Sequence, residues 1–423
     1  MNLGGAHDRT RKTVLLATTV AVLLVSIHSA FGAPTGKPRV AKNDGTALPK
    51  RMPLSKGRDY FVDGQKGVDR GPGTLTRPWQ TINYALGRVP LAGSRVLVRG
   101  GTYVGAVEFN RSGDPSNPVT LRAYPGEHVL LTAPPKSLLN AVWIYGASGI
   151  RIRGFEVTGP TSNNGFRIEN SHDVEVAGCN IHNAGHMGLE VVGTGSGGNR
   201  NIQVWSNRFH DNGGAWISED PYWIRGDHAI YWGATSSDTD GVDHTAYGGV
   251  VANNLIYDQA FGRGVQIGSQ VSGLIVTNNT IYRSYQQDFR AGNGIQFWGQ
   301  DNPYAPRDVL VVNNILADNA HHGVFGSGDN PLMQSNVVRN NLAWNNPDGD
   351  FRTTFSITSS PLFQLGPRNI TGHDPLFVGA STLDLRLRPG SPAIGKADPA
   401  YAPATDFKGR LRSSAPDLGA LEH

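Results

Sequence analysis

The 423-residue chain has a single cysteine, Cys179, so no disulfide can form within it. A free cysteine of this kind usually behaves as a small, buried apolar side chain. Only 17% of the residues are charged, and they form no basic stripe of the kind that binds nucleic acid. Beyond residue 32, no apolar run is long enough to cross a bilayer. No lysine occurs between Lys136 and Lys396, which leaves the middle of the chain without an amine base.

The N-terminus has the pattern of an export signal. A basic cluster precedes an apolar run over residues 13–26, and the small residues Ala30 and Gly32 suit signal peptidase. We predict a signal peptide over 1–32, a flexible linker over 33–57 and one domain over 58–423. Removal of the signal leaves 35 basic and 33 acidic residues, a balance of +2. We expect a secreted or periplasmic monomer with no nucleic-acid partner and no membrane contact after signal cleavage.

The rest of the chain is rich in glycine and repeats itself. One half of the repeat has the form V-x-N-N-x-I, as in VANNLI and VTNNTI, and its second asparagine recurs after 47, 25, 35 and 27 residues, at Asn207, Asn254, Asn279, Asn314 and Asn341. Cys179 occupies the same place in a degenerate copy. A period near 25 residues with insertions is typical of a solenoid. We expect these asparagines to stack from coil to coil and to bond through their amides.

The other half of the repeat has the form G-φ-x-φ, where φ is apolar. Alternation of apolar and polar residues predicts strands rather than helices. The fold class is therefore all-β, a parallel β-helix with its coils over about 94–365. Its open ends need caps. We predict a short helix over 78–86 at one end and a Pro-rich tail over 366–423 at the other.

At both ends the sequence resembles a known group. Residues 60–86 (YFVDGQKGVDRGPGTLTRPWQTINYAL) and 374–397 (DPLFVGASTLDLRLRPGSPAIGKA), followed by DFKGR and DLGALE, resemble secreted right-handed β-helix proteins of the pectate-lyase-like superfamily. The resemblance implies a right-handed coil. It also implies a polysaccharide partner, although that superfamily contains lyases, hydrolases, epimerases and proteins without known catalysis, so fold alone does not fix the activity.

When the G-φ-x-φ strands are aligned, their outward positions form a column: Arg167, Glu190, Tyr231, Gln266, Gln296 and Phe325. The residue before each glycine forms a second column: Asn164, Met187, His228, Arg263, Asn293 and His322. A third position contributes Glu169 and Trp298. From this face we predict catalytic roles for Glu190, Asp227, His228, Tyr231 and Arg263. We predict substrate contacts from Arg167, Gln266, Asn293, Gln296, Trp298 and Trp223.

The longest spacing in the repeat surrounds the strand GDHAIYWG, and solenoid insertions of this kind often form the binding face. These insertions contain Trp223, whose ring either packs against a sugar ring or anchors the loop to the coil. They also contain Asp238, Asp240 and Asp243 around a glycine, a weak calcium signal because the order does not match a known loop. No other cofactor is indicated, and zinc has no ligand spacing. His186, His321 and His322 resemble turn residues, and Arg151 and Arg153 resemble a solvated strand face.

Three activities remain open. Elimination on a uronate polysaccharide needs a base, a cation near the carboxylate and an acid. His228 or Tyr231 would be the base, and Arg263 or Arg167 the cation. The resemblance implies a lysine or arginine base, often with calcium, and the repeats lack lysine. Hydrolysis needs two carboxyls, with Glu190, Asp227, Glu219 and Asp220 as the candidates. Binding without turnover would leave Asp227 and His228 as turn residues. We favour the lyase narrowly.

Overall fold

The structure is a computed structural model. It describes residues 47–134, 139–159, 164–194, 197–213, 227–234, 246–285, 292–299, 305–327, 335–354, 361 and 363–423. The chain divides into two compact units, Met1–Val40 and Ala41–His423, and every described residue belongs to the second. The predicted signal peptide and the linker up to residue 46 lie outside the described residues.

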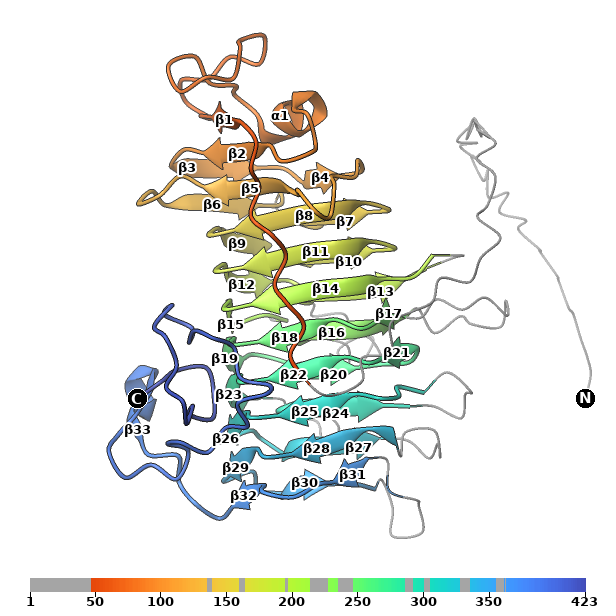
Figure 1. Ribbon diagram of the computed structural model, residues 1–423, viewed down its shortest axis with the longest axis vertical. Coiled ribbons are helices and arrows are strands. Elements are labelled where there is room, and N and C mark those ends of the chain that lie inside the picture. The colour runs from red at the N-terminus through yellow and green to blue at the C-terminus, as the bar shows by residue number, and fades with distance from the viewer. Residues whose placement is uncertain are drawn as a thin grey trace, which may run out of the picture. The chain divides into compact units, whose positions relative to one another are not determined.

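Within those residues the strands form three long parallel sheets (Figure 1). The 13-stranded sheet contains β1 (Asp59–Val62), β2 (Arg95–Val98), β5 (Val119–Ala123), β8 (Ser148–Arg153), β11 (His172–Ala177), β14 (Arg200–Trp205), β17 (Ala246–Tyr247), β18 (Val250–Ala252), β21 (Val271–Ser272), β22 (Ile275–Thr277), β25 (Leu310–Val312), β28 (Val337–Arg339) and β31 (Gln364–Leu365). The nine-stranded sheet contains β4 (Val107–Phe109), β7 (Val142–Tyr145), β10 (Phe166–Glu169), β13 (Leu189–Gly193), β16 (His228–Ala234), β20 (Arg263–Ile267), β24 (Ile295–Trp298), β27 (His322–Ser327) and β30 (Gly349–Arg352). The ten-stranded sheet contains β3 (Gly101–Val104), β6 (Val129–Thr132), β9 (Glu156–Gly159), β12 (Asn180–Ala184), β15 (Arg208–His210), β19 (Leu255–Gln259), β23 (Thr280–Ser284), β26 (Ile315–Ala317), β29 (Leu342–Trp344) and β32 (Ile370–Thr371).

The chain visits the three sheets in turn, so that β10, β11 and β12 make one coil and β13, β14 and β15 the next. Parallel strands pair about 4.8 Å apart, which is the rise from one coil to the next. Alternate residues face inward, and on β16 both Ile230 and Trp232 are fully buried. Each such apolar side chain contributes roughly 1.5–3 kcal/mol by burial. The parallel β-helix predicted from the repeat is confirmed.

The predicted asparagine ladder is present inside the coil. Asn279 donates from Nδ2 to Val251 O (2.9 Å) and to Asn314 Oδ1 (3.0 Å), and its own Oδ1 accepts the backbone N–H of Asn254 (2.9 Å). The pattern repeats from Asn207 to Asn341 and extends one step beyond the prediction, to Asn369. At its N-terminal end the ladder stops at Cys179, whose N–H donates to Asn207 Oδ1.

The first asparagine of each N-N pair has a different task. Asn253, Asn278, Asn313 and Asn340 have positive φ angles, which asparagine tolerates better than most residues. Their side chains therefore turn outward, and their amides donate to backbone carbonyls of the C-terminal tail at Thr405, Asp417, Asp398 and Lys396.

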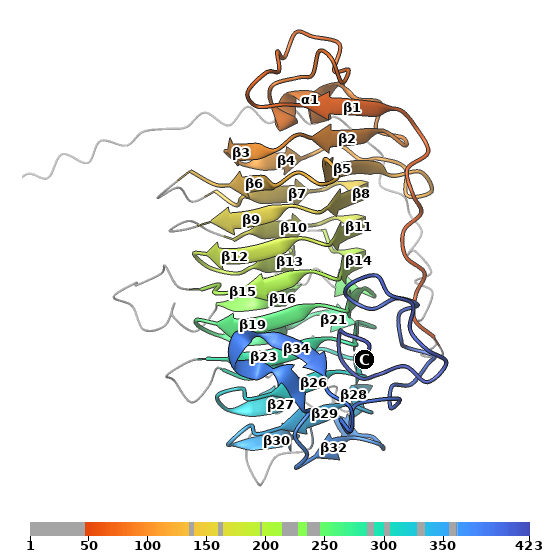
Figure 2. The same ribbon diagram turned by 90° about the vertical axis from the view of Figure 1, so that its left-hand side faces the viewer.

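The predicted tail over 366–423 contributes β32 to the ten-stranded sheet, and the residues after it lie along that sheet (Figure 2). It contains the antiparallel pair β33 (Phe377–Gly379) and β34 (Asp384–Leu387), joined through the 3₁₀ turn Ala380–Thr382. Phe377, Leu385 and Leu387 pack on the outer side chains of the sheet from Leu255 on β19 to Leu342 on β29. The tail thus covers apolar surface that the solenoid would otherwise expose.

At the other end, helix α1 (Ile82–Arg88) buries Ile82, Ala85 and Leu86 against the core. It begins four residues later than the predicted start because Thr81 still has an extended backbone and serves as the N-cap. The Asp69 carboxylate accepts the N–H groups of Gln80 and Thr81, and Thr81 then caps the helix through its hydroxyl. Residues 47–57 run extended across the 13-stranded sheet (Figure 1).

Candidate functional site

The outward column lies on the nine-stranded sheet. Strand pairing confirms the alignment and extends it at both ends, in the order Glu108, Trp143, Arg167, Glu190, Tyr231, Gln266, Gln296, Phe325 and Arg352. The second column follows the same register, with His228 directly beside Arg263. The structure therefore brings together, on consecutive coils, most of the side chains that were predicted to act.

In each G-φ-x-φ strand the glycine lies at a corner of the coil, where both the glycine and the apolar residue after it face the interior of the solenoid. A Cβ on Gly264 would lie 2.6 Å from Gly294 O and 2.5 Å from a methyl group of Ile281. Such contacts leave no room for a side chain. Because the corner glycine faces inward, the residue before it turns outward. The Arg263 guanidinium accordingly reaches the outward column, where its Nε donates to Gln296 Oε1.

Arg167 is the centre of the first charged group. It donates from Nη1 to Glu190 Oε2 (2.6 Å) and from Nε to Glu169 Oε2 (2.8 Å). Asn164 also donates to Glu190 Oε2, at 2.7 Å. Burial raises the pKa of Glu190, and the attraction to Arg167 only partly offsets that effect. Burial also acts on Glu169, but hydrogen bonds from Thr194 and Arg167 outweigh it and lower the pKa of that carboxyl. The two carboxyls on one arginine thus differ in their tendency to hold a proton.

Asp227 pairs with His186, a residue that the sequence assigned to a turn. The Asp227 carboxylate contacts His186 Nδ1 and is almost completely buried. Burial raises the pKa of Asp227. Burial alone would lower the pKa of His186, but the carboxylate reverses this and raises it. The register that aligns β13 with β16 also places His186 beside Asp227, so extending the aligned columns by one position would have found this pair.

His228 is buried, with 1% of its surface exposed. Among the described residues its Nδ1 has no hydrogen-bond partner. The next coil approaches so closely that a Cβ on Gly262 would meet Asp227 O and lie 2.9 Å from His228 Nδ1. Burial lowers the pKa of His228 well below its usual value, and the positive charge of Arg263 lowers it further. The imidazole is therefore neutral near pH 7.

Amide side chains surround the Arg263 guanidinium. Gln296 Oε1 accepts hydrogen bonds from Arg263 and from Asn293 Nδ2, the latter at 2.9 Å. Gln296 Nε2 and Gln266 Oε1 are buried and have no hydrogen-bond partner among the described residues. Buried amide atoms without partners are rare and invite an explanation. Here they stand in the outward column next to the guanidinium.

Tyr231 lies half-buried on the outer face with its ring near that of His228, the ring centroids 6.0 Å apart. Its hydroxyl donates to Ala234 O at 3.3 Å, at the opposite end of the strand from the imidazole. Further along the column, His322 is stacked on Phe325 rather than serving only as a turn residue. Trp298 is half-buried at the end of β24. The face thus carries an imidazole and a phenol side by side, and it has an aromatic end.

Several predicted residues lie outside the described residues. These are Trp223, the hydrolase candidates Glu219 and Asp220, and the calcium candidates Asp238, Asp240 and Asp243. In the part of the chain that the structure describes, no three His, Cys, Asp or Glu side chains are grouped to hold a metal ion. In the same part, no helix is long and apolar enough to cross a membrane.

Comparison with known protein families identifies the family to which the chain belongs. The family described as Pel9A-like, right-handed beta helix region matches residues 60–360, about 71% of the 423 residues. The chain belongs to the Pel9A-like right-handed β-helix family. The match spans the candidate site from Trp143 to Phe325, and the resemblance read from the two ends of the sequence is confirmed.

Two curated proteins are similar to this Pel9A-like chain. Pectate lyase PEL9 of Emericella nidulans is 26% identical over 350 residues, covering 71% of this chain and 76% of that protein. Uncharacterized protein YwoF of Bacillus subtilis is 27% identical over 152 residues, covering 35% of this chain and only 28% of YwoF. Among solved structures, pectate lyase Pel9A is 16% identical with a TM-score of 0.59, covering 88% of this chain and 97% of that one. At this identity the structural match supports the fold.

Proposed function

We propose that this Pel9A-like protein is an exported polysaccharide lyase that cleaves a uronate-containing polysaccharide by β-elimination on the outer face of the nine-stranded sheet. One observation carries the proposal: the neutral imidazole of His228 lies in register beside the guanidinium of Arg263. Elimination requires a proton acceptor and a fixed positive charge side by side. The similarity to a protein named pectate lyase points to the same substrate class.

The chemistry assigns a task to each group. A base removes the proton from the carbon next to the uronate carboxylate, and the arginine stabilises the charge that develops on that carboxylate. The bond to the leaving glycosidic oxygen then breaks, a carbon–carbon double bond forms, and the oxygen receives a proton. Arg263 is the charge-stabilising group. Arg167 is less suited to this task because two carboxylates already neutralise it.

Two groups compete for the role of base. His228 has the better pKa, because a neutral imidazole accepts a proton at neutral pH. Tyr231 has the better access, because its side chain is half-buried on the outer face whereas His228 is almost fully buried. The rings of Tyr231 and His228 are stacked with their centroids 6.0 Å apart, so the group that is not the base is our candidate to protonate the leaving oxygen.

The first experiment follows ultraviolet absorbance and reducing ends together, with polygalacturonate and with alginate, each with and without calcium. A lyase produces both signals because its product is unsaturated. We expect Arg263→Gln to lower kcat by about 10²–10³, as the loss of one charge-stabilising donor does elsewhere. Arg88→Gln, an exposed arginine on α1, is the matched control and should leave kcat unchanged.

The pH profile of kcat/KM then identifies the base. If His228 is the base, activity falls only well below pH 6.5, where the imidazole finally takes a proton. If Tyr231 is the base, activity rises on the alkaline side instead, because a phenol must lose its proton before it can accept one. Absence of ultraviolet product with every uronate polymer would contradict the lyase proposal.

Hydrolysis remains the second candidate because of the two carboxyls on Arg167. A glycosidase needs one protonated and one ionised carboxyl, and the pKa values of Glu190 and Glu169 are shifted in those opposite directions. Glu169 joins Glu190 and Asp227 as a candidate that sequence reasoning had not placed in this role. Reducing ends without ultraviolet absorbance, abolished by Glu190→Gln, would favour hydrolysis over elimination.

A further inference from the structure

A polar groove lies away from the candidate site, at the corner between the 13-stranded and ten-stranded sheets. It has a volume of about 370 Å³ and is lined by residues of three successive coils, 122–127, 153–154 and 177–178. Its floor is made of small residues. Gly126 and Gly178 have no heavy atom within 4 Å of a Cβ position. The backbone at this corner is therefore open to a ligand.

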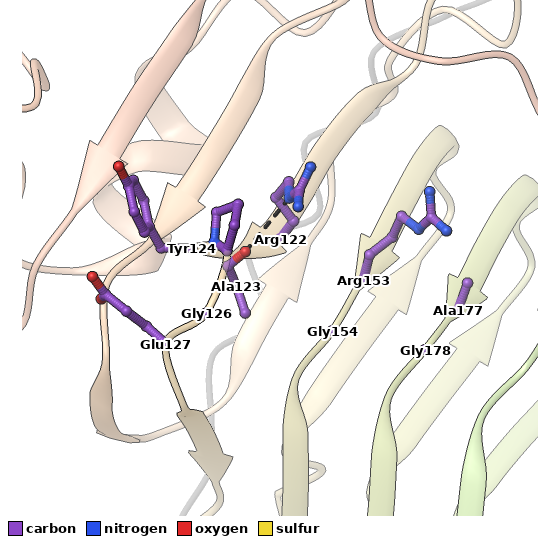
Figure 3. A pocket seen from close by; sticks show the side chains of 10 residues that line it. Arg122, Ala123, Tyr124, Gly126, Glu127, Arg153, Gly154, Ala177 and Gly178 are labelled. Carbon is purple, nitrogen blue, oxygen red and sulfur yellow. Dashed lines mark hydrogen bonds between the residues drawn. The ribbon is translucent and has the colours of Figure 1, made fainter. Parts of the chain in front are cut away.

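Two arginines stand on neighbouring strands in this groove. Arg122 on β5 pairs in register with Arg153 on β8, and Arg153 with Ala177 on β11. Figure 3 shows the two arginine side chains extending in the same direction from adjacent strands, with Ala177 on the next strand. Like charges directly opposite one another on a sheet repel and lower stability. The pair therefore needs a compensating charge.

The protein supplies little of that charge. Glu175 is the buried carboxylate behind the groove, and its two oxygens are already bonded. Arg151 donates to Oε1 at 3.1 and 2.8 Å, and Arg51 donates to Oε2 at 3.0 Å. Arg153 Nε lies 3.9 Å from Oε1, beyond hydrogen-bond distance. Arg151, which the sequence placed on a solvated strand face, is in fact buried by this pairing and by residues 47–57.

Glu127, the other carboxylate in the groove, is also paired. Arg99 donates to both of its oxygens, at 2.8 and 2.9 Å, and packs over the ring of Tyr124 at 4.7 Å. Among the described residues around the groove, the arginines thus outnumber the carboxylates: Arg51, Arg99, Arg122, Arg151 and Arg153 lie near Glu127 and Glu175, and Asp63 adds to the negative charge near Arg99. Arg122 forms no ion pair with any described carboxylate, and its one hydrogen bond, to Ala123 O, is long at 3.5 Å.

From this geometry we infer that the corner groove is an accessory binding site for a linear polyuronate, in which Arg122 and Arg153 bind carboxylates one coil apart. Guanidinium groups suit this task because their planar donors match carboxylate geometry. The coil rise of about 4.8 Å sets the spacing between the two positive charges, and a polymer with a repeated carboxylate can satisfy both. The ligand class rests on the proposed function, whereas the anionic character rests on the groove itself.

Arg153 supports this assignment through its environment. Its side chain keeps 38% of its surface exposed, so a ligand can reach it. Burial of the rest lowers its pKa, and the nearby Arg51, Arg151 and Arg122 lower it further, while Glu175 alone raises it. A bound carboxylate would remove this mutual repulsion.

The test is affinity electrophoresis of the full chain in gels that contain polygalacturonate. We expect Arg122→Gln with Arg153→Gln to weaken retention about a hundredfold, since the loss of each charged contact should weaken binding about tenfold. The matched control, Arg70→Gln with Arg88→Gln, removes the same charge from exposed sites elsewhere and should change retention less than twofold. A gel with a neutral polysaccharide should retain none of the proteins.

Unchanged retention of the groove variant would overturn the inference, and so would an equal loss in both double variants, which would indicate a diffuse charge effect. Turnover separates this result from the proposed function. The groove variant should keep the wild-type kcat on short uronate oligomers. A protein without any lyase activity could still show groove-dependent retention, so the two proposals can fail independently.

Discussion

Replacement of His228 by glutamine should change how the stability of the protein depends on pH. The wild-type imidazole is buried beside Arg263, and its pKa is well below 6.5. Below pH 6.5 the unfolded chain takes up a proton at this residue while the folded chain does not. Protons bound only by the unfolded state favour unfolding, so stability falls as the pH drops from 6.5 toward the folded pKa.

The magnitude follows from linkage. One proton bound only by the unfolded state costs about 1.4 kcal/mol per pH unit. Relative to pH 7.5, the wild type should lose at most about 1.4 kcal/mol at pH 5.5 through this residue alone, and at most about 2.7 kcal/mol at pH 4.5, these limits applying where the folded imidazole takes up no proton. His228→Gln removes the titration, so the variant should lack this part of the loss. His210 and His322 also have lowered pKa values, but they titrate in both proteins and cancel in the difference.

The assay is guanidinium unfolding of both proteins from pH 4.5 to 7.5, followed by tryptophan fluorescence, to which the buried Trp232 on the same strand contributes. The quantity of interest is the difference between the two stability curves as a function of pH, because a constant offset only reports lost packing. A difference that grows toward acidic pH in favour of the variant is the expected result. Parallel curves would refute the conclusion that the fold holds His228 in its neutral form.

Three further outcomes are expected. Asn279→Leu should lower the free energy of unfolding by about 3–5 kcal/mol because it leaves the buried N–H of Asn254 and other ladder groups without partners. Asn369→Leu, at the half-buried end of the ladder, should lower it by only about 1–2 kcal/mol. Equal losses for the two variants in guanidinium unfolding would contradict this account of the ladder. Gly264→Ala should destabilise by about 1–3 kcal/mol because its Cβ would meet the next coil, and an unchanged melting temperature would argue against that corner geometry. Cys179, whose pKa burial raises to about 11, should resist thiol reagents at pH 8 in the native protein and react once guanidinium unfolds it, so rapid native labelling would show that the thiol is exposed.

Most of the fold could be predicted from the sequence because the repeat fixes the register. Each V-x-N-N-x-I copy places an asparagine at the same turn, and each G-φ-x-φ copy places a glycine at the same corner. When successive coils stack in register, each ladder asparagine lies beside the next one and can form a hydrogen bond with it. The tail was harder to place, because the amides of Asn253 and Asn278 that bind it belong to the same N-N pairs as the ladder and carry no separate sequence signal.

The alignment of the candidate site was also predictable, since its columns follow the same register. Its charge states were not. The same register, extended by one position, places His186 beside Asp227, but it does not say which way the pKa of either group shifts. Glu169 and Glu190 share Arg167, so the direction in which each pKa shifts depends on burial and on partners such as Thr194.

The sequence by itself determined the parallel β-helix and the order of side chains along its outer faces, because a local repeat dictates which residue stacks on which. The tertiary structure alone decided the charge state of those side chains and the balance of charge around them. Burial holds His228 neutral, and the extended segment over 47–57 brings Arg51 to Glu175 from 124 residues away, so that the arginines Arg122 and Arg153 are left in excess in the corner groove. Desolvation and long-range ion pairing depend on three-dimensional neighbours, which no local pattern specifies.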